Sequence, residues 1–365
     1  MSVKNKRSLL IACCLLLVGG LIYFLSWHDA FLYHQDIAEV TQVTPLSSHK
    51  TQDEFKNSDQ THRQEVHLRL LNGKHADKKV TVKNTWSNSG AFDQNFSAGQ
   101  QVFVDLQKSA HGLTGQISGF KRDTYLLLLC WLVIALLFLT MKFAGLKALF
   151  SVIINFCVFI FFVNLDVSLN LNNFFWLFVL SALIFTALSL AIVIGWNKQC
   201  VVTFASITAG TALALGIGVL VLKATSSSLH YESLDFATQA PKQLFLSATV
   251  IGLLGAVMDA ATDIVSTIFE LKRAQPQLSV KQLSLSGLSV GRAILGPLVN
   301  VLLLIFFAET VPLAVLFFRT GNSIAYTFDW TMTLGVVQSL ISGIGIALVI
   351  PAASVLAAWS LKKEG

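Results

Sequence analysis

The sequence predicts an α-helical polytopic membrane protein with about eight transmembrane helices and a small extracytoplasmic β-rich, barrel-like domain between the first two helices. Two observations lead to this prediction. Hydrophobic residues make up 54% of the chain and charged residues 13%, which is too apolar for an ordinary soluble domain. About eight apolar runs are long enough to cross about 30 Å of hydrocarbon, and a long polar segment follows the first of them.

These runs define the domain organisation. Residues 1–27 are expected to form an N-terminal transmembrane anchor, residues 28–121 an extracytoplasmic linker and β-rich domain, and residues 122–365 a transmembrane domain of about seven helices. The predicted spans are 8–27, 124–141, 146–164, 173–195, 201–222, 244–268, 284–308 and 331–359.

Basic residues in the short loops predict the orientation, because lysine and arginine are retained on the cytoplasmic side. Both termini are therefore expected in the cytoplasm and residues 28–121 outside it. The net charge of +6 then reflects membrane topology, and we expect the lipid bilayer and no nucleic acid as a partner. The residues on the predicted cytoplasmic side are Lys4, Lys6, Arg7, Lys142, Lys147, Lys198, Lys272, Arg273, Lys281, Lys362 and Lys363.

The N-terminal run allows two interpretations. Leu10-Ile11-Ala12-Cys13 is similar to the cleavage box of a bacterial lipoprotein, whereas the apolar run continues unbroken to Leu25, as in an uncleaved helix. We favour the anchor because the apolar core ahead of Cys13 is very short for a signal sequence.

The exterior segment contains strand-like runs at 65–71, 78–84, 100–106 and 113–119, separated by turn sequences. A small β-barrel or β-sandwich is the expected fold. The polar residues 41–63 precede these runs and are expected to form a linker.

Two acids stand in the predicted span 244–268. A carboxylate in hydrocarbon costs about 2.5–3.5 kcal/mol on insertion scales, so Asp259 and Asp263 are expected to have a role inside the membrane. At 100° per residue both lie on one half of the helix together with Gly252 and Gly255. This polar face is expected to point into the bundle.

The next span carries a cation. Arg292, Gly296 and Asn300 share one face, and Pro297 removes a backbone donor, so Gly296 and Pro297 are expected to kink or break the helix. At 1.5 Å per residue Arg292 lies about 12 Å from the cytoplasmic boundary, between Asp263 at about 9 Å and Asp259 at about 15 Å. We therefore expect the acids to contact Arg292.

Two further features concern packing and the last loop. Residues 309–330 are expected to form an exterior connection whose Val311–Phe318 portion dips into the interface or re-enters the membrane. Small residues recur four apart in the fifth and eighth spans, and we interpret these stripes as helix-packing faces. They are Ser206, Gly210, Ala214 and Gly218, and Gly335, Ser339, Gly343 and Ala347.

At the acid and arginine motifs the chain resembles a known family. The stretch from Gly255 to Asn300, GAVMDAATDIVSTIFE through GRAILGPLVN, and the stretch SLISGIGIALVIP at 339–351 are similar to the signatures of the YibE/F family of multi-spanning bacterial membrane proteins. The exterior module followed by FKRDTYLLLL at 120–129 resembles the longer, YibE-type members. The resemblance implies a transport-like protein of the bacterial cell membrane, with Asp259, Arg292 and Asn300 at family positions.

The chain departs from this family pattern. Ala293 stands where an acid usually follows the arginine, Gly335 and Gln338 stand where Glu and Arg are common, and Asp263 stands where a serine is usual. The departures imply that the site is incomplete within this chain. A shorter YibE/F-family membrane protein is therefore a candidate hetero-oligomer partner.

Three classes of function compete. A membrane transporter or permease fits the intramembrane Asp259, Asp263, Arg292 and Asn300 as substrate- or ion-binding residues. A non-transporting component would use the acid–arginine contact to join helices and the β-domain to bind a partner or envelope polymer. An intramembrane enzyme is disfavoured, because both acids lie on one helix and the histidines lie outside the predicted spans. We expect no catalytic residues, metal or cofactor.

Overall fold

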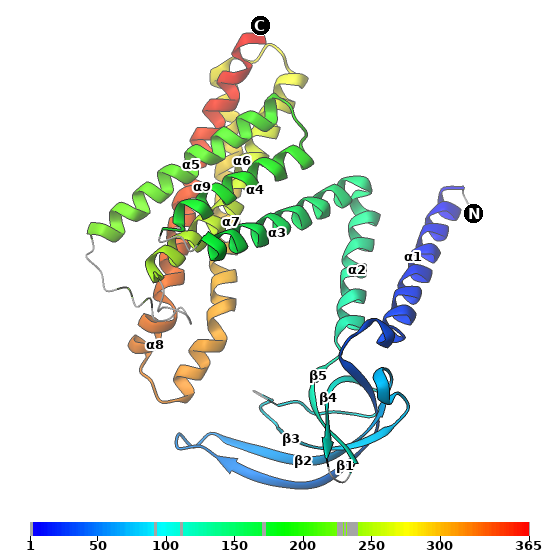
Figure 1. Ribbon diagram of the computed structural model, residues 1–365. Helices are drawn as coiled ribbons and strands as arrows, with labels where there is room; N and C mark the ends of the chain where they lie inside the picture. The colour runs from blue at the N-terminus through cyan, green and yellow to red at the C-terminus, as the bar shows by residue number, and fades with distance from the viewer. Residues whose placement is uncertain are drawn as a thin grey trace. The chain divides into compact units, whose positions relative to one another are not determined.

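The structure is a computed structural model that describes residues 3–90, 93–109, 112–169, 173–224, 229, 231 and 240–364. The chain folds as two compact units, Met1–Lys142 and Phe143–Gly365, which are described separately below. Figure 1 labels their helices and strands.

The first unit places a β-sheet between two apolar helices. Helix α1 (Val3–Trp27) precedes strands β1 (Asp36–Gln52), β2 (Ser58–Leu70), β3 (Lys79–Ser87), β4 (Gln101–Ser109) and β5 (Gly112–Phe120), and helix α2 (Asp123–Met141) follows them. All adjacent strands are antiparallel, in the order β3-β2-β1-β4-β5. The outer strands β3 and β5 also contact each other, so the sheet curls back on itself. Its core contains Val40, Val66, Leu68, Val82 and Val102.

Strand β1 was not expected from the sequence. The predicted strands at 65–71, 78–84, 100–106 and 113–119 correspond to β2, β3, β4 and β5, but residues 41–63 are not a linker. They form most of a long hairpin in which β1 pairs with β2 as far as Gln52 opposite Ser58. Beyond Val43 the β1 side chains are mostly exposed, so no apolar alternation marks the strand. Backbone hydrogen bonding between the two strands replaces burial as the ordering interaction.

A buried lysine joins both helices of the first unit. The Lys121 ammonium lies 2.8 Å from carboxylate oxygens of both Asp29 and Asp123, and it donates to the Ser26 carbonyl at 2.6 Å. The Tyr33 hydroxyl also donates to Asp123 at 2.9 Å. Burial first, and this hydrogen bond second, raise the pKa of Tyr33 to about 12. The phenol therefore remains a donor throughout the physiological pH range.

Replacing Lys121 with Met is expected to open this junction. The substitution leaves two acids beside each other without their shared cation, and removing one partner from a buried ion pair costs on the order of 3 kcal/mol. Hydrogen exchange of the full-length protein should accelerate at the backbone amides of Ala30–Leu32. The exposed Lys83 on β3 provides the control, because Lys83→Met removes the same charge without a buried partner. Equal exchange in the two variants would contradict the role of Lys121.

The second unit is helical. It comprises α3 (Phe143–Leu169), α4 (Phe175–Val193), α5 (Lys198–Ala224), α6 (Pro241–Ala274), α7 (Val280–Arg319), α8 (Ile324–Thr331) and α9 (Thr333–Ser360), followed by the short 3-10 helix η4 (Leu361–Glu364). Within the described residues, seven helices of the chain are long and apolar enough to cross a membrane, namely α2 to α7 and α9. The apolar segment of α1, Cys13–Trp27, is shorter. Each predicted span falls on one of these helices.

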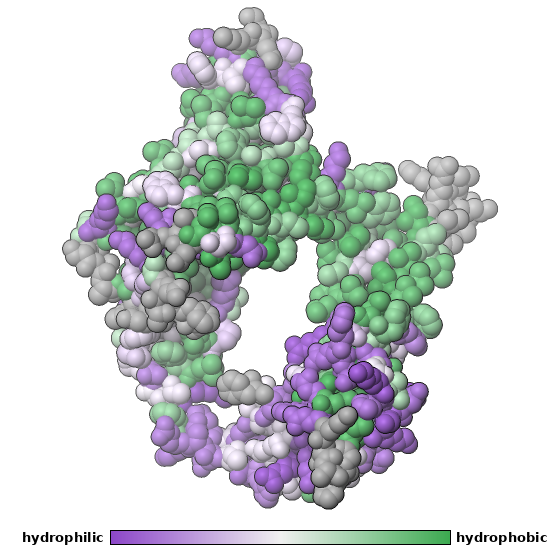
Figure 2. Space-filling view, viewed as in Figure 1, coloured by the Kyte–Doolittle hydropathy of each residue, from purple (hydrophilic) through white to green (hydrophobic). Residues whose placement is uncertain are grey.

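The helices expose apolar side chains, as membrane-spanning segments do. Phe156 of α3, Leu220 of α5 and Leu340 of α9 are each at least 60% exposed. Figure 2 shows hydrophobic side chains over the helices and hydrophilic side chains over the β-sheet. A soluble protein rarely leaves apolar patches of this size uncovered, so the surface is suited to a multi-pass membrane protein.

Helix α9 occupies the centre of the second unit and contacts α5, α6 and α7. Glycines of α5 allow the close approach. A Cβ atom on Gly210 would lie 2.8 Å from the Val349 Cβ, and one on Gly218 would lie 2.8 Å from the Ile341 Cδ1. Both distances are shorter than carbon atoms tolerate. The small-residue stripe of the fifth span is therefore a packing face, as expected.

Helix α7 is longer than the sequence suggested. It runs for 40 residues without interruption through Pro297 and Pro312, so the expected break at Gly296 and Pro297 is absent. Val311–Phe318 is the end of this helix and not a re-entrant loop. Proline is tolerated in apolar helices because neighbouring helices and local adjustments satisfy the freed backbone groups. The helix is about 60 Å long, twice the thickness of the hydrocarbon.

Candidate functional site

Helix α6 has one buried and one exposed face. Its exposed face carries Gly252, Gly255, Asp259 and Asp263. The sequence expectation that this polar face points into the bundle is wrong for the single chain. The apolar face fills that position instead, because it packs against the core around α9. Its buried residues include Val250, Leu253, Val257, Ile264 and Ile268.

Helix α7 is arranged in the same way. Gly287 and Gly291 face the core, where a Cβ on Gly287 would lie 2.7 Å from the Ser354 Oγ and Gly291 lies against Ile350. Arg292 and Asn300 are exposed on the remaining side. Both helices thus use small or apolar residues to pack inward and leave their polar residues uncovered.

The contact between α6 and α7 fixes the relative levels of these residues. A Cβ on Gly287 would lie 2.6 Å from the Ile268 Cδ1, so these two positions are opposite each other. The helices are antiparallel, and Asp263 and Arg292 each lie five residues from this point, about 7.5 Å along the pair. Asp259 lies about 6 Å farther on, and Asn300 about 6 Å beyond Asp259. The four predicted residues therefore occupy adjacent levels of one helix pair.

The expected ion pair is absent from the chain. None of the hydrogen bonds or ion pairs of the described residues joins Arg292 to Asp259 or Asp263. The three side chains are exposed, although their levels match. The side chains lie on the faces of α6 and α7 that point away from the core. They therefore do not contact each other, even though they lie at similar levels along the two helices. We refer to Asp259, Asp263, Arg292 and Asn300 below as the polar face.

A cavity of about 490 Å³ lies farther along the same helices. Its wall begins at Gly252 on α6, about 10 Å beyond Asp259, and at Leu302 on α7, two residues beyond Asn300. The Gln338 amide lies against Gly252, where a Cβ would be 3.0 Å from its Nε2. The polar lining residues are Glu309, Thr310, Thr331, Gln338, Ser339 and Ser342.

The sequence did not point to this cavity. Glu309 was assigned to an exterior connection, and Gln338 was noted only as a departure from a family pattern. The eighth-span stripe was interpreted as packing, yet Gly335 and Ser339 line the cavity. Phe306 packs directly on Gly335, so that part of the stripe serves both purposes. The signal would have been Gln338 and Ser342, four apart on α9, together with Glu309 and Thr310 on α7, had α7 been extended to Arg319.

Comparison with known proteins identifies two family models. Residues 129–363 match the model described as YibE/F-like protein, and residues 31–120 match the YibE/F family N-terminal domain. No curated protein and no solved structure is significantly similar to the chain. In the described part of the chain, no group of three or more His, Cys, Asp or Glu residues is placed to hold a metal ion.

Proposed function

Because the chain belongs to the YibE/F family, we propose that it is a membrane transporter or permease whose substrate or ion site includes Asp259, Asp263, Arg292 and Asn300. The observation that carries this proposal is the position of the polar face. Charged and amide side chains lie away from the ends of two apolar helices, at adjacent levels, and a cavity of about 490 Å³ begins about 10 Å beyond Asp259 along the same helices. Transporters place their sites in this way, near the middle of the bilayer.

The energetic cost of these residues supports a functional role. Each charged side chain costs about 2.5–3.5 kcal/mol at the centre of an isolated apolar helix. Packing alone does not require this cost, since the glycines of α5 and α7 already allow close helix contacts. Asp259 and Asp263 are one turn apart on α6, an arrangement that suits binding of a cation or transfer of a proton.

No described helix of the second unit covers the polar face, whose four side chains are exposed. The membrane-spanning parts of α1 and α2, residues 8–27 and 124–141, contain no charged residue. They therefore offer no ionic partner for Arg292 or for the acids. We propose that a second chain of the family, either another copy of this protein or a shorter YibE/F member, covers the face within the bilayer and completes the site.

Charge jumps on supported membranes would test transport directly. The purified protein is reconstituted into vesicles, and the capacitive current is recorded after concentration jumps of protons, alkali cations, divalent cations, halides and phosphate. We expect a saturable current for at least one of these ions. A response equal to that of protein-free vesicles for every ion tested would contradict the proposal for charged substrates and for proton coupling.

We further propose that the protein lies in the bacterial cell membrane with both termini in the cytoplasm and the β-sheet outside. The basic residues in the short loops support this orientation. Single cysteines placed at Lys50 in the β1–β2 hairpin and at Gln277 between α6 and α7 should react with a membrane-impermeant maleimide from opposite sides. The background for both is a variant without the five native cysteines. Labelling from the same side would contradict the orientation.

The β1–β2 hairpin favours a second candidate function. Its outer part projects mainly polar side chains, and Trp86 of β3 stacks on His62 of β2 with ring centroids 4.2 Å apart. In this alternative, the protein is a non-transporting membrane component whose exterior sheet binds a partner or an envelope polymer. In cells that lack the native protein, Trp86→Ala would then fail to restore the growth of cells that carry it, while Asp259→Asn would restore it. A transporter would show the reverse result.

A further inference from the structure

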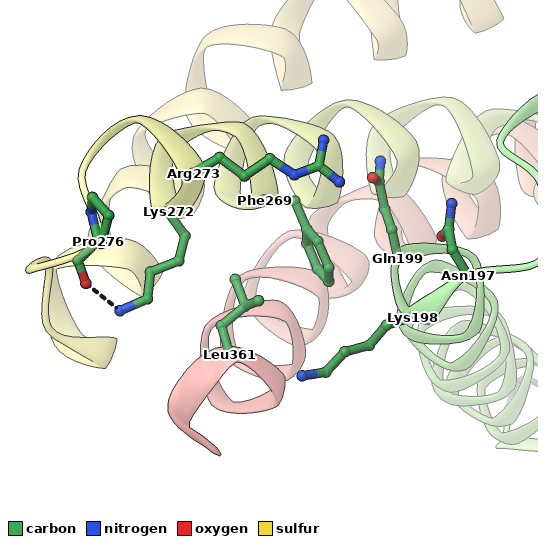
Figure 3. A pocket seen from close by; sticks show the side chains of 8 residues that line it. All are labelled: Asn197, Lys198, Gln199, Phe269, Lys272, Arg273, Pro276 and Leu361. Carbon is green, nitrogen blue, oxygen red and sulfur yellow. Dashed lines mark hydrogen bonds between the residues drawn. The ribbon is translucent and has the colours of Figure 1, made fainter. Parts of the chain in front are cut away.

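A basic cavity lies at the end of the second unit where the C-terminal end of α9 and the α6–α7 connection come together (Figures 1 and 3). Its volume is about 330 Å³. Among the described residues that line it, three are cations and none is a carboxylate. The lining residues are Asn197, Lys198, Gln199, Phe269, Lys272, Arg273, Pro276 and Leu361.

Local hydrogen bonds fix the frame of this cavity. The Asn197 side chain accepts from the Cys200 amide at 2.9 Å and so caps the start of α5, whose N-terminal end carries partial positive charge. The Lys272 ammonium donates to the Pro276 carbonyl at 2.6 Å and to the Leu278 carbonyl at 3.3 Å. Lys272 therefore holds the connection between α6 and α7, as the dashed bond in Figure 3 shows.

Arg273 has a different environment. None of the hydrogen bonds or ion pairs of the described residues involves its guanidinium. In Figure 3 the guanidinium lies above Phe269, on the side of Gln199. The Lys198 side chain extends along another wall of the cavity, beside Leu361. A cavity lined by basic side chains raises the local concentration of anions.

Two tryptophans indicate where the cavity lies relative to a bilayer. Trp196, just before α5, is 83% exposed, and Trp359, two residues before Leu361, is 65% exposed. Exposed tryptophans of membrane proteins gather at the level of the lipid headgroups. The cavity between them is therefore at the depth of lipid phosphate groups.

We propose that this cavity binds a phosphate group, with Arg273 and Lys198 as its charged contacts and the Asn197 and Gln199 amides as neutral donors. An arginine guanidinium matches phosphate oxygens in a bidentate arrangement. Basic cavities between helix ends on the cytoplasmic side suit anionic lipid headgroups. A soluble phosphate presents the same chemistry to these residues. This inference does not depend on the proposed transport function.

Thermal unfolding of the full-length protein, delipidated in a neutral detergent, would test the site. We expect phosphatidylglycerol to raise the unfolding midpoint and phosphatidylcholine to leave it unchanged. In Arg273→Gln with Lys198→Gln, the half-saturating phosphatidylglycerol concentration should rise roughly 30-fold, since each cation near a membrane surface contributes about fivefold. Lys272 is kept, because its loss would also disturb the α6–α7 connection.

The control removes the same charge elsewhere on the predicted cytoplasmic side. Lys147 and Lys281 are exposed and do not line the cavity, so Lys147→Gln with Lys281→Gln should retain the response of the original protein. A parallel titration uses inorganic phosphate without lipid. A response to phosphate alone assigns the site to a soluble ligand, and a response to phosphatidylglycerol alone assigns it to lipid. The proposal is overturned if neither stabilises the protein, or if the cavity variant and the control respond alike.

Discussion

Asp259→Asn is expected to abolish the ion-dependent current of reconstituted vesicles. The substitution keeps the size of the side chain and removes the charge that the site is proposed to use for binding. Loss of one charged contact to a bound ion costs at least about 2 kcal/mol, so the current at a fixed ion concentration should fall about 30-fold or more. The measurement is the capacitive current after a concentration jump, normalised to the amount of protein in the membrane.

Glu270→Gln is the matched control for this experiment. Glu270 is an exposed acid on the same helix, seven residues beyond Asp263 and near the end of α6. It should retain the current, because it lies outside the polar face. The double variant Asp259→Asn with Arg292→Gln separates transport from simple helix joining. A joining role tolerates removal of both charges together, whereas a transport site does not. Full current in the double variant would contradict the proposed site.

The sequence predicted the apolar helices better than any other feature. A helix that crosses a membrane needs a long apolar run with few charges, so each span can be recognised from its own residues alone. Helices α2, α4 and α9 therefore begin and end within about two residues of their predicted spans. The same rule failed for α7, because it assumes that a helix ends where the membrane does. Val311–Phe318 continues the helix beyond that limit.

Strand β1 was missed because backbone pairing, and not burial of its side chains, holds the outer part of this strand in place. Its partner β2 supplies backbone hydrogen bonds along the polar half, and pairing between strands distant in sequence is not encoded in local composition. For the same reason, Thr44 to Gln52 lacked the alternation that identified β4 and β5.

The sequence predicted that the four candidate residues lie at adjacent levels of one helix pair, but it did not predict which way their side chains face. Helical periodicity places Asp259 and Asp263 on one face of α6. The rise of 1.5 Å per residue along two antiparallel helices places Arg292 of α7 at a similar level. The face of α6 that packs against the core is the one that buries more apolar side chains there. The side with Leu253, Val257 and Ile264 packs against α9, and the acids remain uncovered. The expected Arg292 contact within the chain fails for this reason.

This outward orientation leads to the second large prediction, which concerns a second copy as the cover. Copies inserted with the same topology and related by a two-fold axis along the membrane normal keep every residue at its level. Arg292 of one copy then lies at the level of Asp263 in the other, and about 6 Å from the level of Asp259. The face carries both signs of charge, so it is complementary to itself. Gly252, Gly255 and Ala293 on the exposed sides leave room for close approach.

Charge exchange between two differently tagged copies tests this arrangement. Asp263→Arg alone and Arg292→Asp alone each place like charges at the same level in a dimer of identical copies, so each should weaken association on the order of 100-fold. When the two variants are expressed together, each cation of the Asp263→Arg copy meets an acid of the Arg292→Asp copy. Co-purification in native-lipid discs should therefore recover for the mixture and stay low for either variant alone. Lys147→Asp, on exposed α3, should have no effect. If tagged copies of the original protein fail to co-purify at all, the second copy is not the cover, and a shorter YibE/F chain expressed beside this one becomes the partner to test by the same exchange.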